Sequence, residues 1–345
     1  MTRIAPRPVT ALLFAGSLLV GGLASPTTAQ ERPVFGPRLE GYAYPHPVRV
    51  FSLQSQRQTL EMTYMDVAPT GAANGRVVVL LHGKNFCSAT WAPTIDVLSQ
   101  AGFRVIAVDQ IGFCKASKPE AYQFSLAQLA ANTRALLDSL EVERPVVVGH
   151  SMGGMLAIRY ALQNPEVVDQ LVLVNPIGLE DWQAEGVPYA RLDDAFASER
   201  RTTFDSIKGY QQRVYYDGEW RPAYDAPVEM LAGMYAGPGG EIVAWNQAQT
   251  SDMIFTQPVV HELPRLKTPT TLIIGGKDTT APGANRAAPE VQARLGQYPA
   301  LGRTAAAAIP NSRLIEFPRL GHSPQTQDPD AFHGALLDTL GQDTP

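Results

Sequence analysis

Short apolar runs alternate along the chain with longer segments in which apolar residues recur at helical spacing. Residues 77–81 form a continuous Val- and Leu-rich run, typical of a strand buried on both faces of a sheet. The pattern continues, with strands expected at 104–108, 146–148, 171–174, 270–274 and 313–317 and helices at 90–101, 125–140, 152–163 and 330–340. This alternation predicts a mainly parallel, doubly wound sheet with helices on both faces.

Two earlier segments, 48–53 and 59–67, alternate apolar and polar residues as half-buried antiparallel strands do, which brings the expected strands to eight. The alternation of strands and helices stops near Leu179. Residues 180–262 contain many Trp and Tyr but no run typical of a buried strand. We therefore expect an α/β core over residues 30–179 and 263–345, interrupted by a helical cap at 180–262.

Residues 1–29 have the pattern of a secretory signal peptide. Arg3 and Arg7 precede an uncharged stretch from Val9 to Ala24, and small residues follow as far as Ala29. The stretch is short for a bilayer span and contains three glycines, so a membrane anchor is the weaker interpretation. We expect this segment to be removed and the protein to be exported, either to the periplasm or out of the cell.

Composition and charge argue against several classes of partner. Hydrophobic residues make up 45% of the chain and charged residues 18%, as in a globular protein. Removal of residues 1–29 takes away two arginines and moves the formal charge from −5 to −7. An acidic chain is poorly suited to binding nucleic acid or an anionic membrane. We also expect no stable membrane insertion after signal removal, and no sequence feature specifies an oligomeric state.

Residues 149–153 have the form G-x-S-x-G, with Ser151 at the centre. The motif lies directly between a Val-rich strand and a helix, where a serine must adopt a strained backbone conformation. The flanking glycines remove side chains that would collide there. The hydroxyl is raised above a helix N-terminus, which favours developing negative charge. We predict that Ser151 is a nucleophile rather than part of an ordinary glycine-rich turn.

A serine hydroxyl needs a general base at neutral pH, and the chain has six histidines. His322 lies between the last expected strand and the last expected helix, so its loop should open onto the same sheet edge as Ser151. We predict that His322 is the general base. His150 lies within the serine turn, and His82 directly follows a buried strand, where packing and loop anchoring are the simpler roles.

The imidazole needs an acid that fixes its tautomer. Asp278 follows the strand expected at 270–274, and it gives the chain order Ser, Asp, His. We predict that Asp278 is this acid; its alternative role is a helix cap. The preceding strand is followed by Asn175 instead of an acid, and Asp181 and Asp252 in the insertion are weaker candidates.

Two backbone N–H groups must receive the negative oxygen of a tetrahedral intermediate. Met152 directly follows the nucleophile and provides one of them. Lys84 directly follows the His82-Gly83 pair after a buried strand, and we predict that it provides the other. We expect the Lys84 side chain to be solvated rather than catalytic.

The order of these motifs resembles that of the α/β-hydrolase superfamily, and the chain is similar to its capped branch, which includes haloperoxidase-like esterases, epoxide hydrolases, haloalkane dehalogenases and meta-cleavage-product hydrolases. The motifs are His82-Gly83, Asp109 with Gly112, Gly149 to Gly154, Gly276 to Asp278, and Gly321-His322. The resemblance implies an α/β-hydrolase fold with an inserted helical cap, and it places Asp109 in a structural loop without a chemical role. It implies chemistry that needs no cofactor and no metal, and the sequence contains neither metal-ligand spacing nor a dinucleotide fingerprint.

At two positions this chain differs from members of that branch, and each difference argues against some of them. Epoxide hydrolases and haloalkane dehalogenases use an aspartate nucleophile, whereas this chain has Ser151. Meta-cleavage-product hydrolases carry a longer glycine run after the His-Gly pair, whereas this chain has Lys84-Asn85-Phe86.

The chain has two cysteines, Cys87 and Cys114. Each lies six residues beyond the end of a predicted strand, at Leu81 and Val108. In the fold that the resemblance implies, those strands are neighbours, so both cysteines should emerge on the same rim. We predict a disulfide, with two reduced, packed cysteines as the alternative.

The expected function is two-step hydrolysis of a small or medium carboxylic ester or lactone, in an apolar pocket beneath the aromatic cap. Three alternatives stay open. The first is hydrolysis of a C–C bond in a vinylogous diketone acid, which would need a cationic group for the carboxylate. The second is a cofactor-free haloperoxidase or a peptidase with the same triad, and the third is a small-molecule binder without turnover.

Overall fold

In the described part of the chain, eight strands form one sheet in the order β1-β2-β4-β3-β5-β6-β7-β8. The computed structural model describes residues 1–3, 5, 8 and 32–341, so nearly all of the predicted signal peptide lies outside the described residues. The strands are β1 (Val48–Ser55), β2 (Gln58–Val67), β3 (Val77–Leu81), β4 (Arg104–Asp109), β5 (Val146–His150), β6 (Gln170–Val174), β7 (Thr270–Gly275) and β8 (Ser312–Phe317).

Strand direction follows the hydrophobic pattern. β1 pairs with β2 and β2 with β4 in antiparallel register, whereas β4, β3, β5, β6, β7 and β8 pair in parallel. The alternating segments thus form the antiparallel edge, and the continuous apolar runs form the buried parallel centre. The predicted mainly parallel eight-stranded sheet is confirmed.

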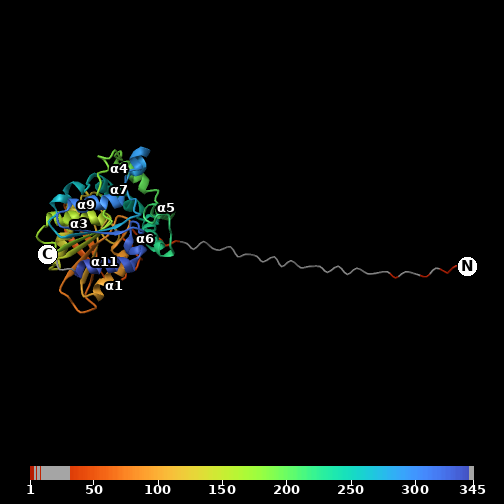
Figure 1. Cartoon of the computed structure of the whole chain (residues 1–345), viewed down its shortest axis with the longest axis horizontal. Coiled ribbons are helices and arrows are strands. Elements are labelled where there is room, and N and C mark those ends of the chain that lie inside the picture. The colour runs from red at the N-terminus through yellow and green to blue at the C-terminus, as the bar shows by residue number, and fades with distance from the viewer. Residues whose placement is uncertain (4, 6–7, 9–31, 342–345) are drawn as a thin grey trace. The chain divides into compact units, whose positions relative to one another are not determined.

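Helices cover both faces of the sheet (Figure 1). On one face, α1 (Ala92–Gln100) and α11 (Pro329–Gly341) pack against side chains such as Val78 and Val148. On the other, α2 (Leu126–Ser139), α3 (Met152–Gln163) and α9 (Tyr298–Ala308) bury the larger apolar cluster. The helix expected at 90–101 is preceded by a 3₁₀ turn, η1 (Ser88–Trp91), which overlaps its predicted start. Pro93 lies in the first turn of α1, a position that proline suits because its missing N–H would have no partner in the helix.

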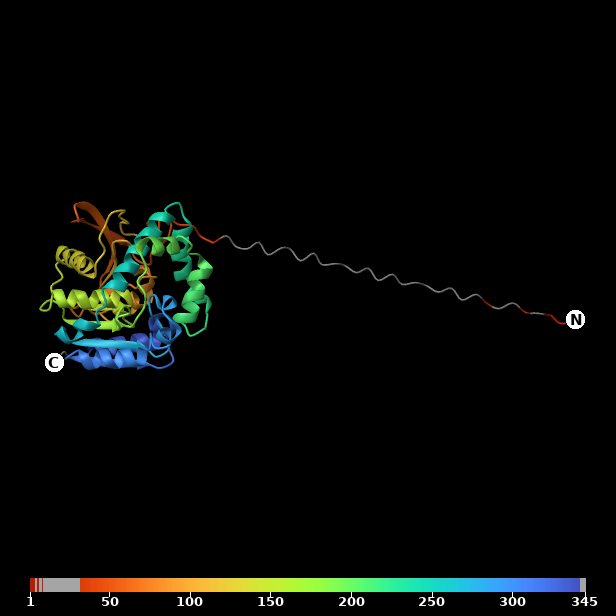
Figure 2. The same ribbon diagram turned by 90° about the horizontal axis from the view of Figure 1, so that it is seen from above.

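The segment between β6 and β7 is helical, and no strand lies in residues 180–262 of the described chain. In Figures 1 and 2 its helices gather together on one side of the sheet. They are α4 (Leu192–Glu199), α5 (Phe204–Val214), α6 (Asp225–Ala236) and α7 (Gly240–Thr256), with 3₁₀ turns η2 (Pro222–Tyr224) and η3 (Val260–Arg265). Between β7 and β8 lie η4 (Ala284–Arg286), α8 (Pro289–Gln292) and α9, and α10 (Pro324–Gln327) precedes α11. The division of the chain into core and cap domains stays a prediction.

Of the helices that the structure describes, none combines the length and apolar character that crossing a bilayer requires.

Two loops at the carboxyl ends of β3 and β4 are joined by the predicted disulfide. Cys87 and Cys114 are bonded, with their Cα atoms 5.8 Å apart. Beside them, the fully buried Asp109 accepts hydrogen bonds from the backbone N–H of Ser88 at 2.8 Å and from the hydroxyl of Tyr44 at 2.7 Å. The disulfide prediction is therefore confirmed, and the hydrogen bonds of Asp109 match the structural role that the family resemblance implied.

Replacing both cysteines by serine (Cys87→Ser with Cys114→Ser) should lower the free energy of unfolding by roughly 3–4 kcal/mol in the loop-entropy model. The bond closes a loop with a sequence separation of 27, which restricts the unfolded chain. Urea denaturation measures the change, and reductant should shift the wild type but leave the double variant unaffected. Equal midpoints for the oxidised wild type and the variant would contradict the prediction.

Candidate active site

Ser151 stands at the turn between β5 and α3, with backbone angles φ 56° and ψ −120°. A residue with a side chain is strained at positive φ, so the surroundings must hold it there. A Cβ added to Gly149 would lie 2.2 Å from the carbonyl oxygen of Gly153, and one added to Gly153 would lie 2.3 Å from that of Leu81. Neither position admits a side chain, which is the role that the sequence motif predicted for its glycines.

His322 and Asp278 lie in direct contact and are buried. The Nδ1 atom of His322 is 2.7 Å from Oδ2 of Asp278. The two residues are 0% and 1% exposed. Because an ionised carboxylate only accepts hydrogen bonds, this contact assigns the proton of the neutral ring to Nδ1 and leaves Nε2 as the acceptor. The structure thus brings together the two residues that the sequence predicted as base and acid.

Asp278 is held by its own loop after β7 and by Asn175 from the loop after β6. Its Oδ1 accepts the backbone N–H of Thr280 at 2.8 Å, and its Oδ2 accepts Nδ2 of Asn175 at 2.8 Å. The Oδ1 of Asn175 accepts the backbone N–H of Gly275 at 3.0 Å. Asn175 therefore stands where a second acid was considered from the sequence, but its amide fixes Asp278.

The ring of His322 packs against Tyr215, which follows α5 in the insertion. The ring centroids are 4.3 Å apart, and the backbone N–H of His322 donates to the carbonyl of Tyr215 at 2.9 Å. The hydroxyl of Tyr215 accepts Nδ2 of Asn85 from the loop after β3 at 3.0 Å. Burial raises the pKa of this hydroxyl well above its ordinary value, so it stays protonated. Tyr215 thus connects the insertion with both the histidine loop and the β3 loop.

The neighbouring His150 has a structural role. Its Nε2 donates to the backbone carbonyl of His322 at 2.8 Å. Burial, together with the nearby His322, lowers the pKa of His150 well below the ordinary value, so the ring is neutral at neutral pH. His150 therefore supports the backbone of the histidine loop.

No hydrogen bond joins Ser151 to His322 in the described residues, and the buried Nε2 of His322 has no hydrogen-bond partner there. Such contacts are often long in ligand-free sites and shorten when substrate binds. Both loops open at the carboxyl edge of the sheet, and the assignment of Ser151, His322 and Asp278 as a triad stays a prediction.

The loop after β3 comes close to Ser151. A Cβ added to Gly83 would lie 3.0 Å from the Cβ of Ser151. In the described residues, the backbone N–H groups of Lys84 and Met152 donate to no protein acceptor. Two free donors beside a serine suit the stabilisation of a negative oxygen, which is the role predicted for them.

The expectation that the Lys84 side chain is solvated is wrong. Its Nζ lies 3.0 Å from Oε1 of Glu199 at the end of α4, and the two side chains are only 19% and 17% exposed. The hydroxyl of Tyr235 donates to Oε2 of Glu199 at 2.5 Å, and that of Ser251 donates to Oε1 at 3.3 Å. Burial alone would raise the pKa of Glu199, but the Lys84 ammonium and these hydrogen bonds lower it overall. The charge on Lys84 is therefore neutralised by the insertion.

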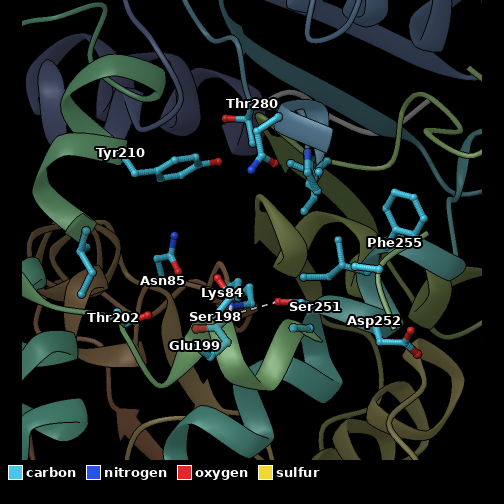
Figure 3. Close-up of a pocket in the computed structure, with 18 of the residues that line it drawn as sticks. Lys84, Asn85, Ser198, Glu199, Thr202, Tyr210, Ser251, Asp252, Phe255 and Thr280 are labelled. Atoms are coloured by element: carbon cyan, nitrogen blue, oxygen red, sulfur yellow. Dashed lines mark hydrogen bonds and ion pairs between the residues drawn. The ribbon is translucent and has the colours of Figure 1, made fainter. Parts of the chain in front are cut away.

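A cavity of about 450 Å³ opens above Ser151, a size typical of small-molecule sites. Figure 3 shows Lys84, Glu199 and Ser251 together in its wall, with Tyr210 and Thr280 on another side. The insertion supplies most of the wall, including the apolar residues Ile207, Leu231, Ile254 and Phe255.

Cys87, Cys114 and Asp109 are the one group of possible metal-ligating side chains found close together in the described residues. The two sulfur atoms are bonded to each other, so they are not thiolates and do not offer a metal site.

The family model described as alpha/beta hydrolase fold matches residues 76–329. Among solved structures, a probable hydrolytic enzyme from Pseudomonas aeruginosa PAO1 is 59% identical, with a TM-score of 0.89 over 90% of this chain and 99% of that chain. A 2-hydroxy-6-oxo-2,4-heptadienoate hydrolase from Pseudomonas putida is 28% identical over 77% of this chain and 89% of its own length. An uncharacterized protein from Mycobacterium tuberculosis is 41% identical over 108 residues, which are 31% of this chain and 31% of the relative's length.

The chain therefore belongs to the α/β hydrolase family, as its motifs suggested. The relatives from Pseudomonas are named as hydrolytic enzymes, which supports hydrolase chemistry at the level of the family.

Several residues of the site were not found from the sequence. Tyr215 is one of many aromatic residues in the insertion, and nothing in the local pattern distinguishes it. Glu199 is separated from Lys84 by 115 positions, so the pair depends on the tertiary fold. Asn175 could have been found from the sequence, because it stands at the end of a central strand, where an acid was considered.

Replacing Asn175 by aspartate should make stability depend on pH. Two carboxylates would then stand where an amide now donates to Asp278, and both cannot ionise at that distance without strong repulsion. One carboxyl would keep its proton in the folded protein to a higher pH than in the unfolded chain. The stability it contributes is therefore present at low pH and lost as the pH rises.

Urea denaturation at about pH 5 and about pH 8 tests this. We expect Asn175→Asp to lose about 1–3 kcal/mol more at the higher pH, relative to wild type at each pH. Asn285→Asp, at an exposed position, is the control with the same charge change. Equal losses for Asn175→Asp at both pH values would show that the amide does not hold Asp278 in solution.

Proposed function

We propose that this protein is a serine hydrolase that cleaves a carboxylic ester or lactone through an acyl-enzyme, with Ser151 as nucleophile, His322 as base and Asp278 as orienting acid. The observation that carries the proposal is the buried contact between His322 and Asp278, which leaves Nε2 of the histidine as an unpaired acceptor. The strained turn that places Ser151 in the wall of the cavity supports it.

In the proposed reaction, Nε2 of His322 takes the proton of the Ser151 hydroxyl while its oxygen attacks the substrate carbonyl carbon. The N–H groups of Lys84 and Met152 bind the negative oxygen of the tetrahedral intermediate. The intermediate then collapses, and the leaving alcohol takes the proton from His322. Water repeats these steps on the acyl-enzyme, which releases the acid and restores Ser151.

Asp278 keeps the imidazole of His322 oriented and stabilises its protonated form while the reaction proceeds. We also propose export to the periplasm or outside the cell, on the pattern of residues 1–29. The disulfide in the core suits an oxidising compartment.

Labelling with a fluorophosphonate probe, followed by intact mass, tests the nucleophile. Wild type should gain one adduct and Ser151→Ala none, because only an activated serine reacts. Asp278→Asn should slow labelling by several orders of magnitude, since the wrong tautomer of His322 cannot accept the proton. A folded wild type without an adduct would break the triad assignment and favour a binding protein without turnover.

A second candidate, hydrolysis of a C–C bond, is favoured by the Pseudomonas putida relative, whose name is 2-hydroxy-6-oxo-2,4-heptadienoate hydrolase. The two reactions separate in one assay. If the wild-type protein bleaches the absorbance of a 2-hydroxy-6-oxo-dienoate substrate but does not hydrolyse activated esters or lactones, C–C cleavage is favoured. The reverse pattern supports the ester or lactone hydrolase.

A further inference from the structure

The side chains that line the cavity above Ser151 include two basic ones, Lys84 and Arg286, and two acidic ones, Glu199 and Asp252. Lys84 and Glu199 form an ion pair with each other. Arg286, in contrast, has no carboxylate in ion-pair contact among the described residues. It is therefore the cation of the pocket wall whose charge the protein leaves uncompensated.

The guanidinium of Arg286 is held in place by neutral groups. Its Nε donates to the backbone carbonyl of Pro188 at 3.0 Å, and its central carbon lies 5.0 Å from the ring centre of Phe255. The guanidinium also lies close to Gly283, where an added Cβ would lie 2.3 Å from Nη2. Gly283 also has φ +80°, so both the backbone and the arginine favour glycine there.

This arrangement leaves both Nη atoms of Arg286 without a hydrogen-bond partner in the described residues. A pair of Nη groups in one plane matches the two oxygens of a carboxylate. Partial burial lowers the pKa of Arg286 from its ordinary value, as expected for a cation without a counter-ion. An anion bound there would relieve that cost.

Asp252 limits the charge that the pocket accepts. Its carboxyl group lies in the same wall and is hydrogen-bonded to the Tyr189 hydroxyl, an interaction that raises the pKa of that hydroxyl. Figure 3 shows Asp252 on the same side as Phe255, the residue on which Arg286 packs. One unpaired arginine in a wall that also holds an acid suits a singly charged group better than a doubly charged phosphate.

We propose that Arg286 is a specificity-determining residue that binds a carboxylate on the substrate, so that the preferred substrate is an ester or lactone with a second, free carboxyl group. This inference rests on the proposed function, because it assumes that the cavity above Ser151 is the substrate site.

Two matched pairs of esters test the proposal. Mono-para-nitrophenyl glutarate and para-nitrophenyl hexanoate differ in charge on the acyl side. Meta-acetoxybenzoate and meta-acetoxybenzamide differ in charge on the alcohol side. In at least one pair, Arg286→Gln should lower kcat/KM for the anionic ester by about 10- to 100-fold, mainly through KM. The neutral ester should stay within about twofold.

Three further variants separate charge from position. Arg286→Lys should restore only part of the preference, because an ammonium lacks the planar pair of donors. Gly283→Ala keeps the charge but displaces the guanidinium, so it should also weaken the preference. Arg200→Gln is the matched control, because Arg200 is likewise exposed and packs on a phenylalanine, Phe196, but it pairs with Glu241 and lies outside the pocket wall.

Direct binding of the same esters to Ser151→Ala protein, with and without Arg286→Gln, gives a readout that does not need turnover. Weaker binding of an anionic ester alone supports the subsite. If Arg286→Gln changes the affinity for both esters of each pair equally, or for neither, the proposed carboxylate subsite is refuted, whichever reaction the protein catalyses. If wild type turns over no ester yet binds the anionic one through Arg286, the proposed function fails and the subsite stands.

Discussion

The left-handed backbone of Ser151 constrains the elements around it. A residue with a side chain stays at such angles only when its neighbours hold it there. Its N–H donates to the carbonyl of Val174 at the end of β6, and its carbonyl accepts from Gly154 and Ile177. A Cβ on Gly154 would lie 2.6 Å from the side chain of Pro176. The conformation of this one residue therefore requires α3, β3 and the loop after β6 to pack closely around it. The close packing requires glycine at positions 153 and 154 of α3.

From that turn, the site is assembled at the carboxyl ends of parallel strands, where the loops of an open α/β sheet meet. A single hydrogen-bonded series runs from the N–H of Gly275 through Asn175 and Asp278 to His322. Its members come from the ends of β6 and β7 and from the loop after β8. Because the groups from Gly275 to Nδ1 of His322 are buried and hydrogen-bonded to one another, the series holds the imidazole in one orientation before any substrate arrives.

The features that the sequence predicted are those governed by local rules. The positions, directions and burial of the strands followed from continuous or alternating apolar runs, and the serine turn from glycines that no other residue can replace. The contact of His322 with Asp278 could be expected because both follow strands of one sheet. Glu199 and Tyr215 lie in an insertion whose helices carry no constraint from the sheet, so their partners depend on packing between distant segments. Lys84 was misjudged for the same reason, since its environment is set by Glu199.

The ion pair between Lys84 and Glu199 also bears on how the molecule can move. Glu199 joins α4 to Tyr235 of α6 and Ser251 of α7, so these helices and the β3 loop are tied at one point. Moving the helical layer away from the β3 loop as a lid would have to break the ion pair between Lys84 and Glu199, whose side chains are only partly solvated. The ion pair therefore ties the insertion to the β3 loop and opposes opening of the pocket between them.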